Sequence, residues 1–199
     1  MDEMADLISG FLKEKGVASA HMIGFSTGAV YLMRLLTLYP DMVANCIAIA
    51  PGGISKHMPK LFHQMKNSVS AVFSRNLFSA GDIRRMLSEC VVDKSAVTER
   101  DVKQYYGPIA DGLTREALMY AVANFDMKGT ADALRQSDHE ILCVWGSEDR
   151  YHPASGSVYF QSVLQNGRYY MVKNAWHLLH EELPARFLEI VFSLSLIHI

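Results

Sequence analysis

The strongest constraint on the fold is a set of short, apolar runs that are separated by helical patterns. Two of them, Cys46–Ala50 and Ile141–Trp145, contain no charged residue, which is typical of strands buried on both faces of a parallel sheet. Shorter runs occur at Ala20–Ile23 and Tyr169–Val172. Because helical patterns lie between the runs, the sequence predicts an α/β fold with a parallel sheet covered by helices. These helices are expected over residues 4–12, 29–36, 155–164 and from 184 onward.

The first expected helix carries an amphipathic stripe. Its apolar positions follow the i, i+3, i+4, i+7 spacing of one helix face, and they are Met4, Leu7, Ile8, Phe11 and Leu12. Gly16 follows the stripe at the place where a glycine typically ends a helix.

A long helical segment interrupts the sheet pattern. About 90 residues separate Ala50 from Ile141, far more than the roughly 2–6 residues of an ordinary joining loop. Within it, one apolar face runs through 61–73, and capping boxes are predicted at Ser79-x-x-Asp82 and Thr98-x-x-Asp101. We therefore predict a helical cap inserted at residues 53–138, between core segments 1–52 and 139–193.

The pentapeptide Gly24-Phe25-Ser26-Thr27-Gly28 has the pattern G-x-S-x-G and lies between an expected strand and an expected helix. In that context the serine occupies a sharp, strained turn that projects its Oγ beyond the sheet. We expect Gly24 and Gly28 to let the strand and helix backbones approach closely. The N–H of Thr27 would then point into the site as an oxyanion-hole donor.

A serine nucleophile needs a base and an orienting acid. Asp149 follows one expected strand and His177 follows the next, in the order Ser, Asp, His that this architecture requires. Two alternatives lie nearby: Glu148 is next to Asp149, and His180 lies three residues after His177. The remaining histidines are interpreted as structural, turn or surface residues, and they are His21, His57, His63, His139 and His152.

These motifs resemble the α/β-hydrolase superfamily, specifically its capped serine esterase, lipase and aminopeptidase-like group. The likeness covers the elbow His21–Gly28, the acid loop Val144–Asp149 and the histidine loop His177–Pro184, but neither the cap nor the tail. The family's motifs imply the catalytic roles of Ser26, Asp149 and His177. One departure is Trp176, because the residue before the histidine is usually glycine; its ring is expected either to reshape the pocket wall or to displace the loop.

The resemblance also implies how the start of the chain relates to the family's fold. In the superfamily the elbow belongs to the fifth strand, and here only one helix precedes it. We therefore expect an N-terminally truncated chain whose early strands and second oxyanion-hole donor are absent. The final residues, Leu194–Ile199, resemble the translation of a transposase end sequence used to build sequencing libraries, so we expect an adapter-derived tail.

Composition excludes several classes of function. A net charge of −2 leaves no electrostatic footprint for nucleic acid, and no apolar run is long enough to span a bilayer. The 3 cysteines fit no zinc spacing, so we expect no metal and no cofactor. With no signal peptide at the start of the chain, the cytoplasm is the expected location. The oligomeric state is left open.

The expected function is hydrolysis of carboxylic esters or related acyl compounds through an acyl-enzyme, with a small-molecule acyl substrate. An acyltransferase or a C–C bond hydrolase would use the same triad. A ligand sensor that retains the fold without turnover is the alternative from a different class.

Overall fold

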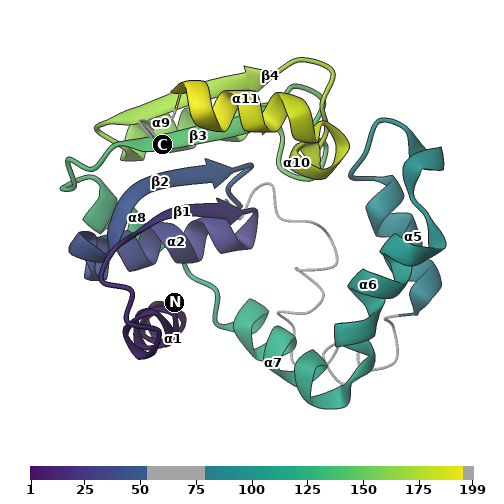
Figure 1. The fold of residues 1–199 in the computed structure, drawn as a ribbon, viewed down its shortest axis with the longest axis horizontal. Helices are drawn as coiled ribbons and strands as arrows, with labels where there is room; N and C mark the ends of the chain where they lie inside the picture. Colours follow the sequence, from purple (N-terminus) through teal and green to yellow (C-terminus); the bar gives the residue numbers. More distant parts are fainter. Residues whose placement is uncertain (53–78, 195–199) are drawn as a thin grey trace. The chain divides into compact units, whose positions relative to one another are not determined.

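The computed structural model describes residues 1–52 and 79–194, and Figure 1 shows them as a ribbon. The chain divides into two compact units. The first comprises Met1–His57 and Asp126–Ile199, and the second comprises Met58–Phe125. The helix expected over 61–73 and most of the expected adapter tail, 195–199, lie outside the described residues.

A parallel sheet forms the centre of the first unit. Its four described strands lie in the order β1-β2-β3-β4, and they are β1 (Ala20–Phe25), β2 (Val43–Ile49), β3 (Ile141–Gly146) and β4 (Gly167–Val172). All pairings are parallel. Every residue of β3 is buried, as are the last four of β2, because helices cover the sheet. The parallel α/β architecture expected from the apolar runs is confirmed.

Six described helices surround this sheet: α1 (Asp2–Glu14), α2 (Thr27–Leu38), α8 (Lys128–Leu134), α9 (Ser157–Val163), α10 (Leu179–Glu182) and α11 (Pro184–Leu194). Helix α2 packs against β1 and β2, and also contacts α1 and α8, while α8 in turn contacts α9. Figure 1 shows α11 on the other side of the sheet from α9. The helix predicted at 29–36 is present as α2 and extends by two residues at each end.

Helix α1 ends as expected, but its buried face coincides only in part with the predicted stripe. Gly16 has φ +70°, and its N–H and that of Val17 donate back to the carbonyls of Lys13 and Leu12, which closes the helix end. The predicted apolar stripe, however, is only partly covered: Leu7 is 67% exposed and Phe11 56% exposed.

Small residues and charges explain this orientation of α1. Ala5 and Ser9 are the residues it buries, and small side chains permit close approach to the neighbouring α2. Arg34 Nε on α2 donates to Asp2 Oδ1 at 2.6 Å. Tyr39, which follows α2, donates its hydroxyl to Asp6 Oδ1 at 2.5 Å. These polar contacts join α1 to α2 and to the residue that follows it, beside the buried Ala5 and Ser9.

The second unit contains α5 (Ala80–Ser88), a 3-10 turn (Lys94–Ala96), α6 (Glu99–Ala110) and α7 (Gly112–Ala123) among its described residues. Both predicted capping boxes are present, at Ser79 with Asp82 and at Thr98 with Asp101. The unit spans Met58–Phe125, so it starts later and ends earlier than the predicted insertion at 53–138. It ends earlier because α8 packs in the first unit. Its role as a cap stays a prediction.

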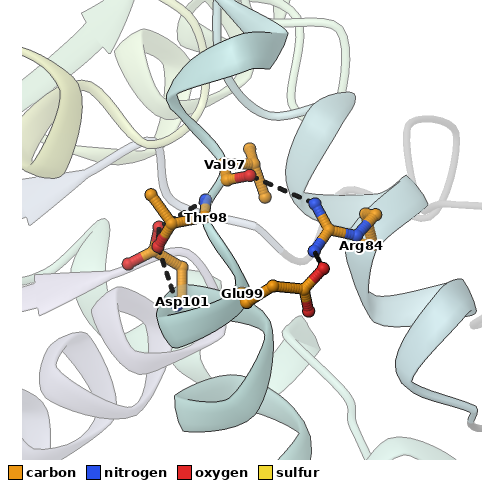
Figure 2. Close-up of polar contacts among 5 residues, drawn as sticks. All are labelled: Arg84, Val97, Thr98, Glu99 and Asp101. Carbon is orange, nitrogen blue, oxygen red and sulfur yellow. Dashed lines mark hydrogen bonds and ion pairs between the residues drawn. The ribbon is translucent and has the colours of Figure 1, made fainter.

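Figure 2 shows how α5 is tied to the start of α6. Arg84 Nη1 donates to the carbonyl of Val97 at 3.2 Å, and the same guanidinium forms an ion pair with Glu99. Beside them, Thr98 N–H donates to Asp101 Oδ2 at 2.8 Å, and Asp101 N–H donates to Thr98 Oγ1 at 3.3 Å. The Thr98 hydroxyl bond also lowers the pKa of Asp101 from its ordinary value. One short segment thus both caps α6 and anchors α5.

The first prediction concerns the edge of the sheet. Among the described strands β1 pairs only with β2, and Ile23 on β1 is 49% exposed. An unpaired apolar edge favours association with other chains. We expect residues 1–199 to self-associate, and Ile23→Lys to reduce this, as measured by light scattering during gel filtration. Val158→Lys, at a 64% exposed position on α9, should change association little. A monodisperse monomer for the unsubstituted chain would contradict the prediction.

Candidate active site

The turn at Ser26 is strained. It joins β1 to α2 with φ 53° and ψ −119°, a backbone conformation that non-glycine residues rarely adopt and that costs about 1–3 kcal/mol. The surrounding backbone holds it in place. Ser26 N–H donates to the carbonyl of Ile49 at 2.8 Å, and the Ser26 carbonyl accepts from the N–H groups of Ala29 and Gly52, each at 3.2 Å. The residue is therefore fixed from both β2 and α2.

The structure explains why residue 24 of the turn is glycine, but it does not require glycine at residue 28. A Cβ added to Gly24 would lie 2.5 Å from Ala29 Cα and 2.8 Å from the Gly28 carbonyl oxygen, so only glycine lets β1 approach the start of α2. A Cβ added to Gly28 would meet no described atom within 4 Å. The expectation that Gly28 is needed for close approach is therefore wrong for the described structure.

This contrast gives a matched pair of substitutions. Gly24→Ala should lower the free energy of unfolding by about 1–3 kcal/mol or more, because backbone atoms must move to relieve the overlap. Gly28→Ala, inside α2, should be neutral or stabilising by up to about 1 kcal/mol, since alanine is the better helix former. Urea denaturation followed by circular dichroism measures both. Equal losses for the two variants would contradict this reading of the turn.

Asp149 and His177 form a buried pair beyond the carboxyl ends of β3 and β4. His177 Nδ1 lies 2.8 Å from Asp149 Oδ2, and the two side chains are 5% and 0% exposed. The other carboxylate oxygen, Oδ1, accepts the N–H groups of Tyr151 and His152, each at 2.8 Å. With an ionised carboxylate, Nδ1 must be the donor, and Nε2 is then the imidazole nitrogen that can accept a proton.

The loops that carry this pair are bonded to one another. Glu148 N–H donates to the carbonyl of Ala175 at 3.0 Å, and Asn174 N–H donates to Ser147 Oγ at 3.0 Å. A Cβ on Gly146 would lie 2.3 Å from the Ala175 carbonyl oxygen, so the two backbones are in direct contact. Asp149 and His177 are thus held by the backbone as well as by their own hydrogen bond.

Trp176 turns its ring toward the acid loop. The guanidinium of Arg150 lies 4.5 Å from the centre of the Trp176 ring, a cation–π distance. Since His177 remains bonded to Asp149, the tryptophan that departs from the family pattern does not displace the histidine loop. It adds a further link between the two loops, one residue away from the Asp149–His177 pair on each chain segment.

Phe25 brings the end of β1 to the histidine loop. Its ring centre lies 4.7 Å from that of His177 and 4.5 Å from that of His180. The residue preceding Ser26 thus touches the imidazole of the buried pair. Ser26 Oγ itself forms no hydrogen bond with His177 in the part of the chain that the structure describes. Of the three predicted triad members, the structure joins two directly and places the third at the neighbouring turn.

The two alternatives behave differently from the predicted pair. Glu148 is exposed and accepts from its neighbour Ser147 at 3.3 Å, while Asp149 holds the histidine. His180 is half-buried, and burial lowers its pKa below the ordinary value. Its Nδ1 has no hydrogen-bond partner among the described residues, and its Nε2 lies 3.8 Å from Glu181 Oε1 at the surface, so His180 lacks the buried carboxylate bond that His177 makes.

His152 was not predicted to belong to the site. Its ring centre lies 5.0 Å from that of His177 in an edge-on arrangement. The signal in the sequence was its position three residues after Asp149 and directly before Pro153, which keeps it inside the tight acid loop. Thr27, the predicted oxyanion donor, is the first residue of α2, where a backbone N–H has no partner within its helix.

Other groups offer little further chemistry. No cluster of three or more histidine, cysteine or acidic side chains suited to a metal ion occurs among the described residues. Burial raises the pKa of the Cys46 thiol to about 12 and that of Cys143 well above its ordinary value, which leaves both thiols unreactive. Within the described ranges, no helix has the length and apolar character needed to cross a membrane.

The parallel sheet, the strained serine turn and the acid and histidine loops at one edge define an α/β-hydrolase fold. A model of the serine aminopeptidase S33 family matches residues 1–184, and the chain belongs to this family.

Curated relatives share low identity over most of the chain. A dihydrolipoyllysine-residue acetyltransferase component of an acetoin cleaving system from Pseudomonas putida is 23% identical over 155 residues, covering 78% of this chain and 40% of the relative. A 2-hydroxy-6-oxononadienedioate/2-hydroxy-6-oxononatrienedioate hydrolase from Comamonas testosteroni is 23% identical over 163 residues, covering 77% and 56%. The chain thus spans about half the length of these relatives.

A solved structure of similar fold is a meta-cleavage product hydrolase from Pseudomonas fluorescens IP01. It superposes with a TM-score of 0.77 at 16% identity, covering 96% of this chain and 70% of that one. At this identity the likeness shows the fold alone.

The Arg150–Trp176 contact can be measured by a double-mutant cycle. Arg150→Met and Trp176→Ala should each lower the free energy of unfolding, and their coupling should be about 0.5–1 kcal/mol, as for exposed cation–π pairs. Urea midpoints of the two single variants and the double variant supply the coupling. Strictly additive losses would show that the two side chains do not hold the loops together.

Proposed function

We propose that the chain is the catalytic part of a serine hydrolase in which Ser26 is the nucleophile, His177 the base and Asp149 the orienting acid. The observation that carries this proposal is the buried hydrogen bond between His177 Nδ1 and Asp149 Oδ2 at 2.8 Å. It leaves Nε2 as the proton acceptor. The strained Ser26 turn supports the proposal because such strain is concentrated at functional sites.

The mechanism follows from these atoms. His177 Nε2 takes the proton of Ser26 Oγ while this oxygen forms a bond to the acyl carbon of the substrate. The oxyanion that develops is stabilised by the N–H of Thr27 at the positive end of α2. Collapse breaks the bond to the leaving group, which receives the proton from His177. Water then attacks the acyl-Ser26 ester through the same proton transfers and releases the acid.

The proposed substrates are small carboxylic esters or related acyl compounds. Cleavage of a C–C bond is the second candidate, because a relative of this chain from Comamonas testosteroni is a 2-hydroxy-6-oxononadienedioate/2-hydroxy-6-oxononatrienedioate hydrolase. Both reactions need the same nucleophile and base. Comparing the rates of p-nitrophenyl ester hydrolysis and of 2-hydroxy-6-oxo-6-phenylhexa-2,4-dienoate cleavage by one preparation would separate them.

Covalent labelling tests the nucleophile. The protein should react with a fluorophosphonate probe at Ser26, detected by mass spectrometry of the labelled peptide, and Ser26→Ala should abolish the reaction. Labelling that survives this substitution would remove Ser26 from its proposed role.

A set of three variants tests the base and the acid. His177→Ala and Asp149→Asn should each lower turnover by about 10⁴-fold, because triad members act as a unit. His180→Ala should lower it by less than about 10-fold, since His180 lacks the buried hydrogen bond to a carboxylate that His177 makes with Asp149. Steady-state ester hydrolysis measures all three. A crippling effect at His180 with little effect at His177 would show that the base is the other histidine.

A further inference from the structure

The Phe25 side chain lies against both histidines of the site. Phe25 is the last residue of β1 and directly precedes Ser26. Its ring centre lies 4.7 Å from that of His177, at an interplanar angle of 48°, and 4.5 Å from that of His180, at 52°. The strand that ends at the nucleophile turn therefore also carries an aromatic ring that contacts the proposed base.

The backbone at Phe25 is held by the same contacts that hold Ser26. Phe25 pairs with Ile49 of β2, and the N–H of Ser26 donates to the carbonyl of Ile49 at 2.8 Å. Gly24, just before them, allows the close approach of α2. A ring attached at residue 25 thus has a fixed place relative to the serine, because one set of backbone contacts holds both residues.

His180 supports the Phe25 ring from α10. The two rings are in contact, and His180 also meets Phe187 of α11 with ring centres 6.1 Å apart. Burial lowers the pKa of His180, which favours a neutral ring that packs as an aromatic side chain. The ring contacts therefore run without interruption from α11 through His180 and Phe25 to His177.

The hydrogen bond to Asp149 does not by itself fix the direction of the His177 imidazole. It holds Nδ1, but the ring can still tilt about that atom and carry Nε2 away from the serine. Contacts with the ring itself restrict this tilt. Tyr151 stacks on His177 with ring centres 5.4 Å apart, yet it belongs to the acid loop, as Asp149 does. Phe25, by contrast, comes from the strand that ends at Ser26.

We propose, resting on the triad of the proposed function, that Phe25 is a positioning residue whose ring, supported by His180, holds the His177 imidazole with Nε2 directed at Ser26 Oγ. Phe25 takes no part in proton transfer. It affects the rate because proton transfer and nucleophilic attack need closely aligned atoms, and a misplacement of about 1 Å can cost about 10²-fold. The second position of the G-x-S-x-G pattern, for which the pattern specifies no residue, then contributes through its side chain.

Fluorophosphonate labelling over a range of probe concentrations separates positioning from binding. It yields the rate constant at saturating probe and, independently, the concentration at half saturation. Phe25→Leu keeps apolar volume but removes the ring, and should lower the rate constant about 10- to 100-fold. The half-saturating concentration should change by less than about 2-fold, since no binding contact is removed. Phe25→Tyr restores a ring and should recover most of the rate.

Phe160→Leu is the matched structural control. Phe160 is fully buried on α9, and its ring centre lies 5.7 Å from that of Trp145, so this variant also loses an aromatic contact in the first unit. It should lower the urea midpoint and leave the labelling rate constant unchanged. Losses of rate that follow the losses of stability in both variants would show that Phe25 is a structural residue only.

Variants of His180 test the same contacts with Phe25 intact, and they carry the test if Phe25→Leu does not fold. His180→Ala should lower the labelling rate constant about 3- to 10-fold, and His180→Phe, which keeps a ring, should recover most of it. In the Phe25→Leu background, His180→Ala should have little further effect, because it acts through the ring of Phe25. Equal rate constants for both His180 variants and the unsubstituted protein would contradict the proposal.

Failure of this inference is distinguishable from failure of the proposed function. If labelling persists in Ser26→Ala, the triad itself is wrong. If labelling depends on Ser26 but Phe25→Leu reacts at the unsubstituted rate, or changes only the half-saturating concentration, the triad stands and the positioning role of Phe25 is overturned.

Discussion

The burial of the Asp149 carboxylate is the constraint on which the rest of the site depends. A charge removed from water is tolerated only when hydrogen bonds satisfy it. Here one oxygen accepts from His177 and the other from two backbone N–H groups of the acid loop. The acid loop must therefore curl around its own carboxylate, and the histidine loop must approach it. The contacts between Glu148 and Ala175, and between Arg150 and Trp176, follow from that approach.

The strained turn at Ser26 is the second constraint on the site. Its positive φ is unfavourable in isolation, so the neighbouring backbone must impose it. The bond from Ser26 N–H to Ile49 and the bond from Gly52 N–H to Ser26 supply this from β2. Gly24 contributes by absence of a side chain, since any Cβ would push α2 away. The position of the serine is thus a property of the β1–β2 pairing and not of the pentapeptide alone.

The sequence predicted strands and helix starts correctly where a local pattern has a single physical cause. Uninterrupted apolar runs at Cys46–Ala50 and Ile141–Trp145 predicted buried parallel strands, and Ser79 and Thr98 predicted the helix starts that the structure has. The spacing of Asp149 and His177 after successive strands predicted their contact, because parallel strands end at the same edge.

Prediction from the sequence failed where the outcome depends on which neighbour a side chain meets. The stripe of α1 indicated a buried apolar face, but Ala5 and Ser9 are the buried residues, and Asp2 and Asp6 bond to Arg34 and Tyr39. Gly28 matches the motif, yet a Cβ added there would meet no described atom within 4 Å. The ring of Trp176, on the histidine loop, contacts the guanidinium of Arg150, on the acid loop. Such contacts join residues far apart in sequence, so no local pattern predicts them.

The register of the sheet is what converts these separate segments into one site. Phe25 pairs with Ile49 at the end of β1, Val144 pairs with Ile49 on the other side, and Gly146 pairs with Val172. Ser26 follows the end of β1, while β3 and β4 run two residues beyond that level before the loops that carry Asp149 and His177. A slip of one residue between β3 and β4 would shift one loop by about 3.3 Å along the strand direction and separate Asp149 from His177. The same strand pairings therefore support both the buried core and the placement of the reactive side chains.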